Sequence, residues 1–475
     1  MTEAPAQFFL LGRANPAPLR EVLESLQTPA DTAEFRECVR GDDAVQFRAD
    51  VERLMLDGAR LGSEQHLLAG RLVRRLVDAP GAPQEWAREL CLDEIAWKAL
   101  VSASTRVSLR PCVATMIVMV QFLHNVVATN KSAAADAMNR IRGDAHGTVE
   151  KMLRCTQGES EEKDLKLAWE LTAALVGFVY TAFESSGDSS CWSWALFQTC
   201  CVGVLGTSVD QDGCLFVQGE NESVFWLSQL TRKALGREDL GPWMEEEMAS
   251  VRVEWMMKWI TFVDEALQGP DAKNLCENVS AVAAFCRLMK SAGGENQQRA
   301  DILHAVVLLV GTWAMVIGEH QEWDLGHRFP VSEVAEEAVN FLQYGHVETQ
   351  SQDANAAAAV VVVAWDMAPI RTALVRLLAY LSGIDAERIA QGRGVYCLLA
   401  ECTVDPKNAM KREWCIVGIR LLCEKSERCR ALIAELQIQE TRSDPVLSDA
   451  GFEAFLDPSS GTPKLRRRTG TPPTL

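Results

Sequence analysis

Apolar and polar positions follow a helical period along most of the chain, most clearly in residues 408–436. Asn408 is a good N-cap. Residues 414–423 carry one charge, Arg420, so the first helix is expected to be apolar on nearly every face and buried from several sides. Ser426 is the expected N-cap of a second helix. Its apolar residues have the spacing i, i+3, i+4, i+7: Cys429, Leu432, Ile433 and Leu436. The pattern therefore predicts a buried helix followed by an amphipathic one.

A second copy of this helix pair lies 44 residues earlier in the chain. The aligned pairs are Val375 with Ile419, Arg376 with Arg420, Leu377 with Leu421, Leu378 with Leu422, Ile389 with Ile433 and Ala390 with Ala434. A weaker copy lies in residues 122–138. The offset falls within the ~40 to 47 residues of armadillo and HEAT repeats. These repeats predict an all-α fold without a sheet: an armadillo/HEAT-like right-handed α-solenoid of stacked helix pairs or triplets.

The rest of the chain predicts further helices separated by short polar breaks. They are expected in residues 45–78, 85–103, 112–130 and 164–183. Pro242 is expected to open one long helix that continues through Leu267. Three acidic residues would lie near its positive end: Glu245, Glu246 and Glu247. Its aromatic stripe would belong to the core rather than to a binding platform: Trp255, Trp259 and Phe262.

Composition divides the chain into four expected parts. Residues 1–40 contain four prolines and predict an irregular N-terminal leader or cap with short helices. Residues 41–345 predict armadillo-like helical repeats, and residues 356–456 predict the C-terminal repeats. Residues 457–475 are basic and rich in proline, so they are expected to be a disordered tail.

The C-terminal repeats resemble a known family. Three stretches between residues 394 and 436, GVYCLLAEC, NAMKREWCIVGIRLLCEK and LIAEL, are similar to the C-terminal domain of the ataxin-10 family. The family pattern is Asn-Pro, Glu-Trp five residues after the Asn, an Ile-Arg-Asn-Leu core and an Asn-Gln pair. Six residues match it: Asn408, Glu413, Trp414, Ile419, Arg420 and Leu422. Ala409 replaces the Pro, Leu421 replaces the core Asn, and residues 428–430 replace the Asn-Gln pair, which argues against a polar ladder across the repeats.

Composition and charge restrict the class of protein. With 48% hydrophobic and 24% charged residues, the 475-residue chain is expected to be folded rather than disordered. The net charge of −18 argues against nucleic acid as a ligand, since phosphates need clustered Lys and Arg. Other proteins, with basic surfaces or peptides, are the expected partners. The sequence leaves open whether the chain forms a homo-oligomer.

The cysteines and the apolar runs bear on the cellular compartment. The 15 cysteines are odd in number and form no C-x-x-C, which indicates a reducing compartment and a cytoplasmic location. Cys200 and Cys201 are expected to fill the core; a redox sensor, the alternative, would need a basic neighbour. The longest wholly apolar run, residues 356–365, is shorter than the ~20 residues that span a bilayer, so no membrane insertion is expected.

Candidate chemistry is sparse. Nucleotide-binding, zinc-protease and serine-hydrolase motifs are absent from the sequence. The best metal candidate is the group His320, Glu322, Asp324 and His327, which is better explained as a solvated loop between helices. The DQDG segment at residues 210–213 begins like a calcium loop but lacks the closing Glu. No catalytic residue, cofactor or metal is expected.

Two classes of function remain. The first is a non-enzymatic scaffold or adaptor for other proteins. The second is an enzyme or ligand-binding protein whose site is assembled from distant residues. The ataxin-10 resemblance favours the first and implies links to cytokinesis and signalling, with neurite outgrowth and neuronal survival in animal relatives. The tail is either an inert end or a phosphorylated switch, with three candidate phosphorylation sites: Thr462, Thr469 and Thr471.

Overall fold

The structure is a computed structural model, and the part that it describes is almost entirely helical. It describes residues 17–467 apart from 27–28, 40–41, 57–63, 78–81, 91, 105–111, 129, 144–145, 156–161, 190–191, 208–221, 250–253, 271, 293–296, 351–367, 404, 406–407, 437–451 and 458–462. The chain forms two compact units: unit 1, residues 1–284, and unit 2, residues 285–475. The all-α class predicted from the sequence is therefore confirmed, apart from one short hairpin.

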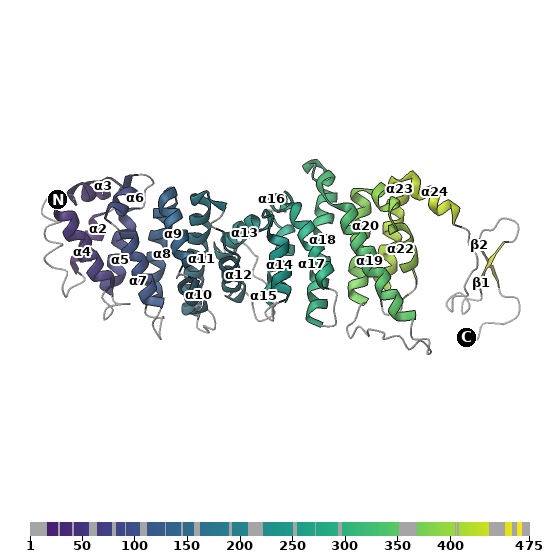
Figure 1. The fold of residues 1–475 in the computed structure, drawn as a ribbon, viewed down its shortest axis with the longest axis horizontal. Helices are drawn as coiled ribbons and strands as arrows, with labels where there is room; N and C mark the ends of the chain where they lie inside the picture. The colour runs from purple at the N-terminus through teal and green to yellow at the C-terminus, as the bar shows by residue number, and fades with distance from the viewer. Residues whose placement is uncertain are drawn as a thin grey trace. The chain divides into compact units, whose positions relative to one another are not determined.

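Unit 1 is a succession of helices (Figure 1). They are α2 (Ala17–Ser25), α3 (Pro29–Cys38), α4 (Asp42–Leu56), α5 (Glu64–Leu76), α6 (Ala82–Glu89), α7 (Leu92–Ser104), α8 (Val113–Val127), α9 (Lys131–Gly143), α10 (His146–Cys155), α11 (Glu162–Ser186), α12 (Trp194–Thr207), α13 (Glu222–Leu235), α14 (Leu240–Ala249), α15 (Glu254–Leu267) and α16 (Ala272–Cys276). α17 (Ser280–Ala292) crosses the boundary between the units. The predicted helix, break and helix of residues 122–138 are present as α8 and α9.

The prediction of one long helix from Pro242 to Leu267 is wrong. α14 already begins at Leu240 and ends at Ala249, and α15 begins at Glu254. Residues 245–247 therefore lie in the second half of α14 instead of at a positive helix end. The assignment of the aromatic stripe to the core is confirmed, because its three members are buried: Trp255, Trp259 and Phe262.

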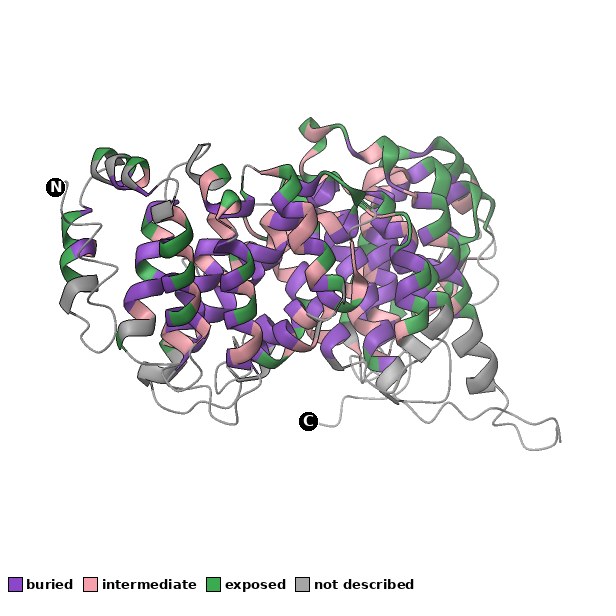
Figure 2. Ribbon diagram, turned by 60° about the vertical axis from the view of Figure 1, so that its left-hand side comes forward, coloured by how far each residue is buried: buried purple, intermediate pink, exposed green. Residues whose placement is uncertain are grey.

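Unit 2 contains the two sequence copies in contact with each other. Its helices are α18 (Gln297–Glu319), α19 (Val331–Gln350), α20 (Ala368–Ile384), α21 (Ala386–Gln391), α22 (Gly394–Glu401), α23 (Ala409–Lys425) and α24 (Glu427–Glu435), with 3-10 turns η3 (Gln321–Trp323) and η4 (Gly326–Arg328). α20 packs against α23, and α21 packs against α24. Buried positions form stripes on the helix faces that meet their neighbours (Figure 2).

A two-stranded antiparallel hairpin follows the helices in the sequence, and it corrects the expectation of a fold without a sheet. β1 (Phe452–Leu456) pairs with β2 (Pro463–Arg467), so the prediction of helical repeats is wrong for residues 452–456 and the prediction of a disordered tail is wrong for residues 463–467. The physical reason is charge pairing across the strands. Arg466 pairs with Glu453 and lies over the Phe455 ring at 4.9 Å, and Lys464 pairs with Asp457. Such cross-strand pairs stabilise a segment that is too polar to form a core of its own.

Candidate functional site

Three helices of unit 2 provide the candidate site. α20 packs against α18 on one side and against α23 on the other. The approach of α23 to α20 depends on Gly418, because an added Cβ would lie 3.3 Å from the backbone Cα of Ala379 and 3.1 Å from Cδ1 of Leu398. The single glycine within α23 thus allows close contact between the backbones of two stacked helices.

A buried charge cluster joins the ends of three helices. The Glu401 carboxylate, at the end of α22, is fully buried and pairs with Arg371 of α20 and with Lys411 of α23, whose Nζ lies 3.2 Å from Oε2. Lys411 also lies 3.9 Å from a carboxylate oxygen of Asp405. Two cations around one buried carboxylate offset its desolvation and fix the positions of α20, α22 and α23. The sequence signal was present, since Glu401 is the one charge in the apolar segment 394–402, but it was missed.

Asn408 is the N-cap residue of α23, as predicted, but its side chain makes no cap hydrogen bond and instead ties α23 to α20. Its Nδ2 donates to the carbonyl of Ala368 at 3.0 Å and to the hydroxyl of Thr372. The two hydrogen bonds use both N–H groups of the Asn408 amide and so direct its nitrogen to α20. The N-cap prediction for Ser426 is confirmed, because its hydroxyl accepts the backbone N–H of Cys429 at 3.0 Å.

A hollow of about 540 Å³, lined by both polar and apolar residues, opens beside this tie. Its lining residues come from α18, α20 and the start of α23: His304, Leu308, Ala368, Pro369, Thr372, Ala373, Arg376 and Asn408. Burial lowers the pKa of His304, the nearby Arg376 guanidinium lowers it further, and Asp301 opposes both effects. Within the described residues, no carboxylate forms an ion pair with Arg376. The hollow therefore presents a half-buried cation and a largely neutral imidazole.

α23 also carries an exposed apolar stripe, which corrects the prediction that this helix is buried from several sides. Met410, Trp414, Val417 and Leu421 follow the spacing i, i+4, i+7, i+11 and therefore share one face. Met410 is 57% exposed and Val417 is 41% exposed, while Trp414 and Leu421 are half-buried. Trp414 meets the Tyr380 ring edge-on at 5.4 Å. We call this set the α23 stripe.

The reason for this difference is that neighbouring helices cover only one side of α23. The buried positions are Lys411, Cys415, Gly418 and Leu422, again one face of the helix. α20, α21 and α22 pack on this helix, and the short α24 follows it. Apolar composition on every face therefore does not mean that every face is covered. An apolar face left in water is a common mark of a binding surface.

The six family-motif residues have different environments. Leu422 is fully buried, Ile419 is half-buried, Asn408 forms the tie to α20, and Trp414 belongs to the α23 stripe. Glu413 and Arg420 are exposed, and Arg420 pairs with Glu424 one turn later at 2.7 Å. The motif thus combines core packing with surface positions, and the structure does not gather it into one site.

The candidate metal ligands in residues 320–327 lie at the surface. His320 contacts Glu322 at 2.8 Å and stacks on Trp323 at 4.1 Å, while His327 lies 3.4 Å from Asp324. Across the residues that the structure describes, no group of three or more His, Cys, Asp or Glu side chains is arranged to hold a metal. The calcium-loop candidate at 210–213 and the phosphorylation candidates Thr462, Thr469 and Thr471 lie outside the described residues.

Cys200 and Cys201 on α12 are fully buried, as expected for core residues. Burial raises the pKa of Cys200 to about 12 and raises that of Cys201 strongly. Both thiols are therefore protonated at neutral pH, which is the opposite of what a redox sensor requires.

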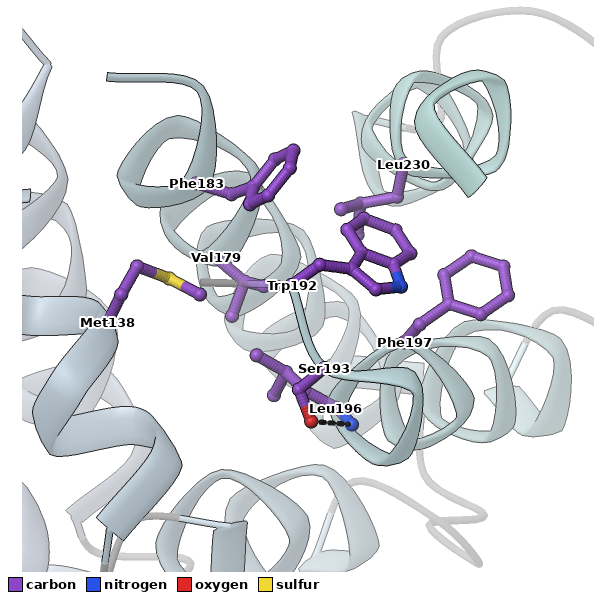
Figure 3. A pocket seen from close by; sticks show the side chains of 8 residues that line it. All are labelled: Met138, Val179, Phe183, Trp192, Ser193, Leu196, Phe197 and Leu230. Atoms are coloured by element: carbon purple, nitrogen blue, oxygen red, sulfur yellow. Dashed lines mark hydrogen bonds between the residues drawn. The ribbon is translucent and has the colours of Figure 1, made fainter. Parts of the chain in front are cut away.

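An aromatic cluster in unit 1 encloses a small apolar pocket (Figure 3). The pocket measures about 10 Å³, room for one water at most. Phe197 faces the pocket from α12, Trp192 faces it from the segment before α12, and Val179 and Phe183 face it from α11. Trp194 stacks on Trp243 at 4.2 Å in the same region. This pocket is a packing defect in an aromatic core, too small for a ligand.

Two described helices are long and apolar enough to cross a membrane by length and composition. They are Lys166–Ser186 and Ala300–Glu319. The buried share of the apolar window is 61% in the first helix and 72% in the second. Such burial is typical of core helices, and both helices pack against others in their units.

The described residues define an almost entirely helical protein of packed helices, with an exposed apolar face on α23. Residues 370–466 match the spinocerebellar ataxia type 10 protein domain, so the resemblance to the ataxin-10 family is confirmed over that stretch. The ataxin-10 homolog of Candida albicans is 28% identical over 88 residues, 18% of this chain and 19% of that protein. Ataxin-10 of Xenopus tropicalis is 27% identical over 127 residues, 25% of this chain and 26% of that protein.

These matches therefore span about a fifth to a quarter of the length of the curated relatives. Among solved structures, the chain is similar to an engineered protein with 12% identity and a TM-score of 0.28, over 89% of this chain and 99% of that one.

Proposed function

We propose that this protein is a non-enzymatic scaffold or adaptor of the ataxin-10 type, an armadillo/HEAT-like right-handed α-solenoid that acts in the cytoplasm. The observation that carries the proposal is the α23 stripe. Its open side exposes Met410 and Val417, and its inner side rests on Tyr380 through Trp414. A surface of this kind gains free energy when a partner removes it from water, at roughly 25 cal/mol per Å² of apolar area.

Charged residues border the stripe, as they do in protein interfaces. Glu413, Arg420 and Glu424 are exposed on the same helix. An apolar centre with a polar rim is the usual anatomy of a specific interface, in which a few large side chains carry most of the affinity. By analogy with the relatives, the process served would be cytokinesis and signalling, and in animals neurite outgrowth and neuronal survival.

A matched pair of substitutions tests the proposal. Val417→Asp places a charge in the centre of the α23 stripe, whereas Val45→Asp makes the same change at an exposed valine of α4 in unit 1. Proteins captured from a lysate by the wild-type chain should be lost with Val417→Asp and retained with Val45→Asp. Equal capture by both variants, with unchanged melting temperatures, would show that the stripe binds no partner.

A further inference from the structure

We propose that the hollow between α18, α20 and α23 binds an acidic side chain, Asp or Glu, of a partner peptide. This inference rests on the proposed function, because it supplies a specificity pocket beside the α23 stripe. It starts from Arg376, a half-buried guanidinium that lines the hollow and forms no ion pair with a carboxylate in the described part of the chain. A chain with a net charge of −18 has an excess of carboxylates, yet none of those described pairs with this cation.

The geometry of Arg376 differs from that of its repeat partner, Arg420. Arg420 lies 44 residues later, has a side chain that is 76% exposed, and pairs with Glu424 of its own helix. Arg376 instead faces the hollow beside His304. A planar guanidinium presents paired donors that match the two oxygens of a carboxylate. Two repeats thus carry the same residue at equivalent positions, one paired on the surface and one facing the hollow.

The other walls of the hollow suit a peptide. The Asn408 amide nitrogen is occupied by Ala368 and Thr372, which leaves Oδ1 as an acceptor for a backbone N–H. Leu308 and Pro369 add apolar surface, and a volume of about 540 Å³ lies within the size range of ligand sites. A short extended peptide can therefore donate a backbone N–H to Asn408, place a carboxylate on Arg376 and rest on the apolar walls.

The hollow adjoins the α23 stripe. Arg376 and Tyr380 lie one turn apart on α20, and the Tyr380 ring contacts Trp414 of the stripe. A single partner segment can therefore place an acidic residue on Arg376 and an apolar residue against Trp414 and Val417. The ligand that this arrangement favours is an acidic residue followed or preceded by large apolar residues.

The test selects random peptides displayed on phage against three immobilised proteins: wild type, Arg376→Gln and the control Arg388→Gln, which removes an exposed arginine of α21 that pairs with Asp385 at 3.0 Å. Peptides recovered with wild type and with Arg388→Gln should be enriched in Asp or Glu next to apolar residues, and this enrichment should vanish with Arg376→Gln. Both variants should melt within a degree or two of wild type. Persistence of the acidic enrichment with Arg376→Gln, or its absence with wild type, overturns the inference.

Synthetic peptides then measure the pairing directly. The best peptide, blocked at both ends so that its termini carry no charge, should lose about tenfold or more in affinity when its Glu becomes Gln, since hydrogen bonds to charged groups contribute at this level. Arg376→Gln should cause the same loss, and combining both changes should add little. Competition by acetate or inorganic phosphate as strong as that by the peptide would identify a small-anion site and refute the peptide assignment.

The two proposals fail in different ways. Peptides that depend on Val417 but show no preference for Asp or Glu would support the scaffold function and refute the proposal that the hollow binds an acidic side chain. Peptides that depend on Arg376 and are unaffected by Val417→Asp support the hollow and count against the stripe. Failure to recover any peptide above background counts against both.

Discussion

Replacing Glu401 with Gln should destabilise unit 2 strongly. The side chain is fully buried, and its two partners, Arg371 and Lys411, have side chains only 12% and 9% exposed. Glu401→Gln keeps the shape but removes the carboxylate that Arg371 and Lys411 share, while Asp405 stays 3.9 Å from Lys411. Removing one partner of a buried ionic cluster lowers the free energy of unfolding by about 3–5 kcal/mol. For a unit of this size that equals a drop of about 6–20 °C in the melting temperature.

The matched control is Glu424→Gln on α23. Glu424 pairs with Arg420 at the surface, where both side chains are more than half exposed, so its loss should cost less than about 1 kcal/mol. Urea unfolding followed by circular dichroism gives both free energies. The variant with Arg371→Met, Glu401→Leu and Lys411→Met should recover most of the lost stability, because no charge is left buried. A Glu401→Gln value within about 1 kcal/mol of the control would refute the reasoning.

Three further outcomes are expected. Asn408→Ala should lower the stability of unit 2 by about 1 kcal/mol in urea titrations, because the Asn408 amide no longer donates to the Thr372 hydroxyl or to the carbonyl of Ala368, which keeps its hydrogen bond from that hydroxyl at 3.1 Å; an unchanged value would show that these bonds add nothing to stability. Trp414→Ala should cost about 1–2 kcal/mol, below the ~3–5 of a fully buried Trp, since part of its surface is already in water. Burial holds the pKa of His124 below its ordinary 6.5 against the opposing effect of Glu222. As pH falls through 6.5 the unfolded chain therefore takes up a proton first and stability is lost; calorimetry between pH 8 and pH 5, as approximate limits, should show a shallower decline for His124→Gln, and identical slopes would contradict this.

Much of the helical fold could be predicted from local sequence. The 44-residue repeat places α20 and α23 correctly, and the Ser426 cap marks the start of α24, because caps and periodicity act within one or two turns. The core position of Trp259 followed from its helical spacing with other aromatic residues. Long-range partners could not be predicted in this way. Whether the Asn408 side chain caps its own helix or bonds to α20 depends on a neighbour 40 residues away.

The candidate site was mostly hidden for the same reason. The sequence shows that α23 is apolar on nearly every face, but which face is covered depends on how α20, α21 and α22 pack against it. Arg376 and Arg420 look equivalent in the repeat, and only packing separates the cation in the hollow from the one at the surface. The hairpin was missed because residues 452–456 resemble the end of the helical repeats and residues 463–467 resemble a disordered tail, and the pairing of two strands cannot be seen in either segment alone.

The central claim is that the α23 stripe is a protein-binding surface, and site-specific photo-cross-linking tests it most directly. A benzophenone amino acid at position 417 would report on the stripe, and the same group at position 45 provides the control, since both positions are exposed valines. In a cell lysate, position 417 is predicted to cross-link to a discrete protein, with the product competed away by unlabelled wild-type chain and absent for position 45. No product from position 417, or the same products from both positions, would contradict the claim.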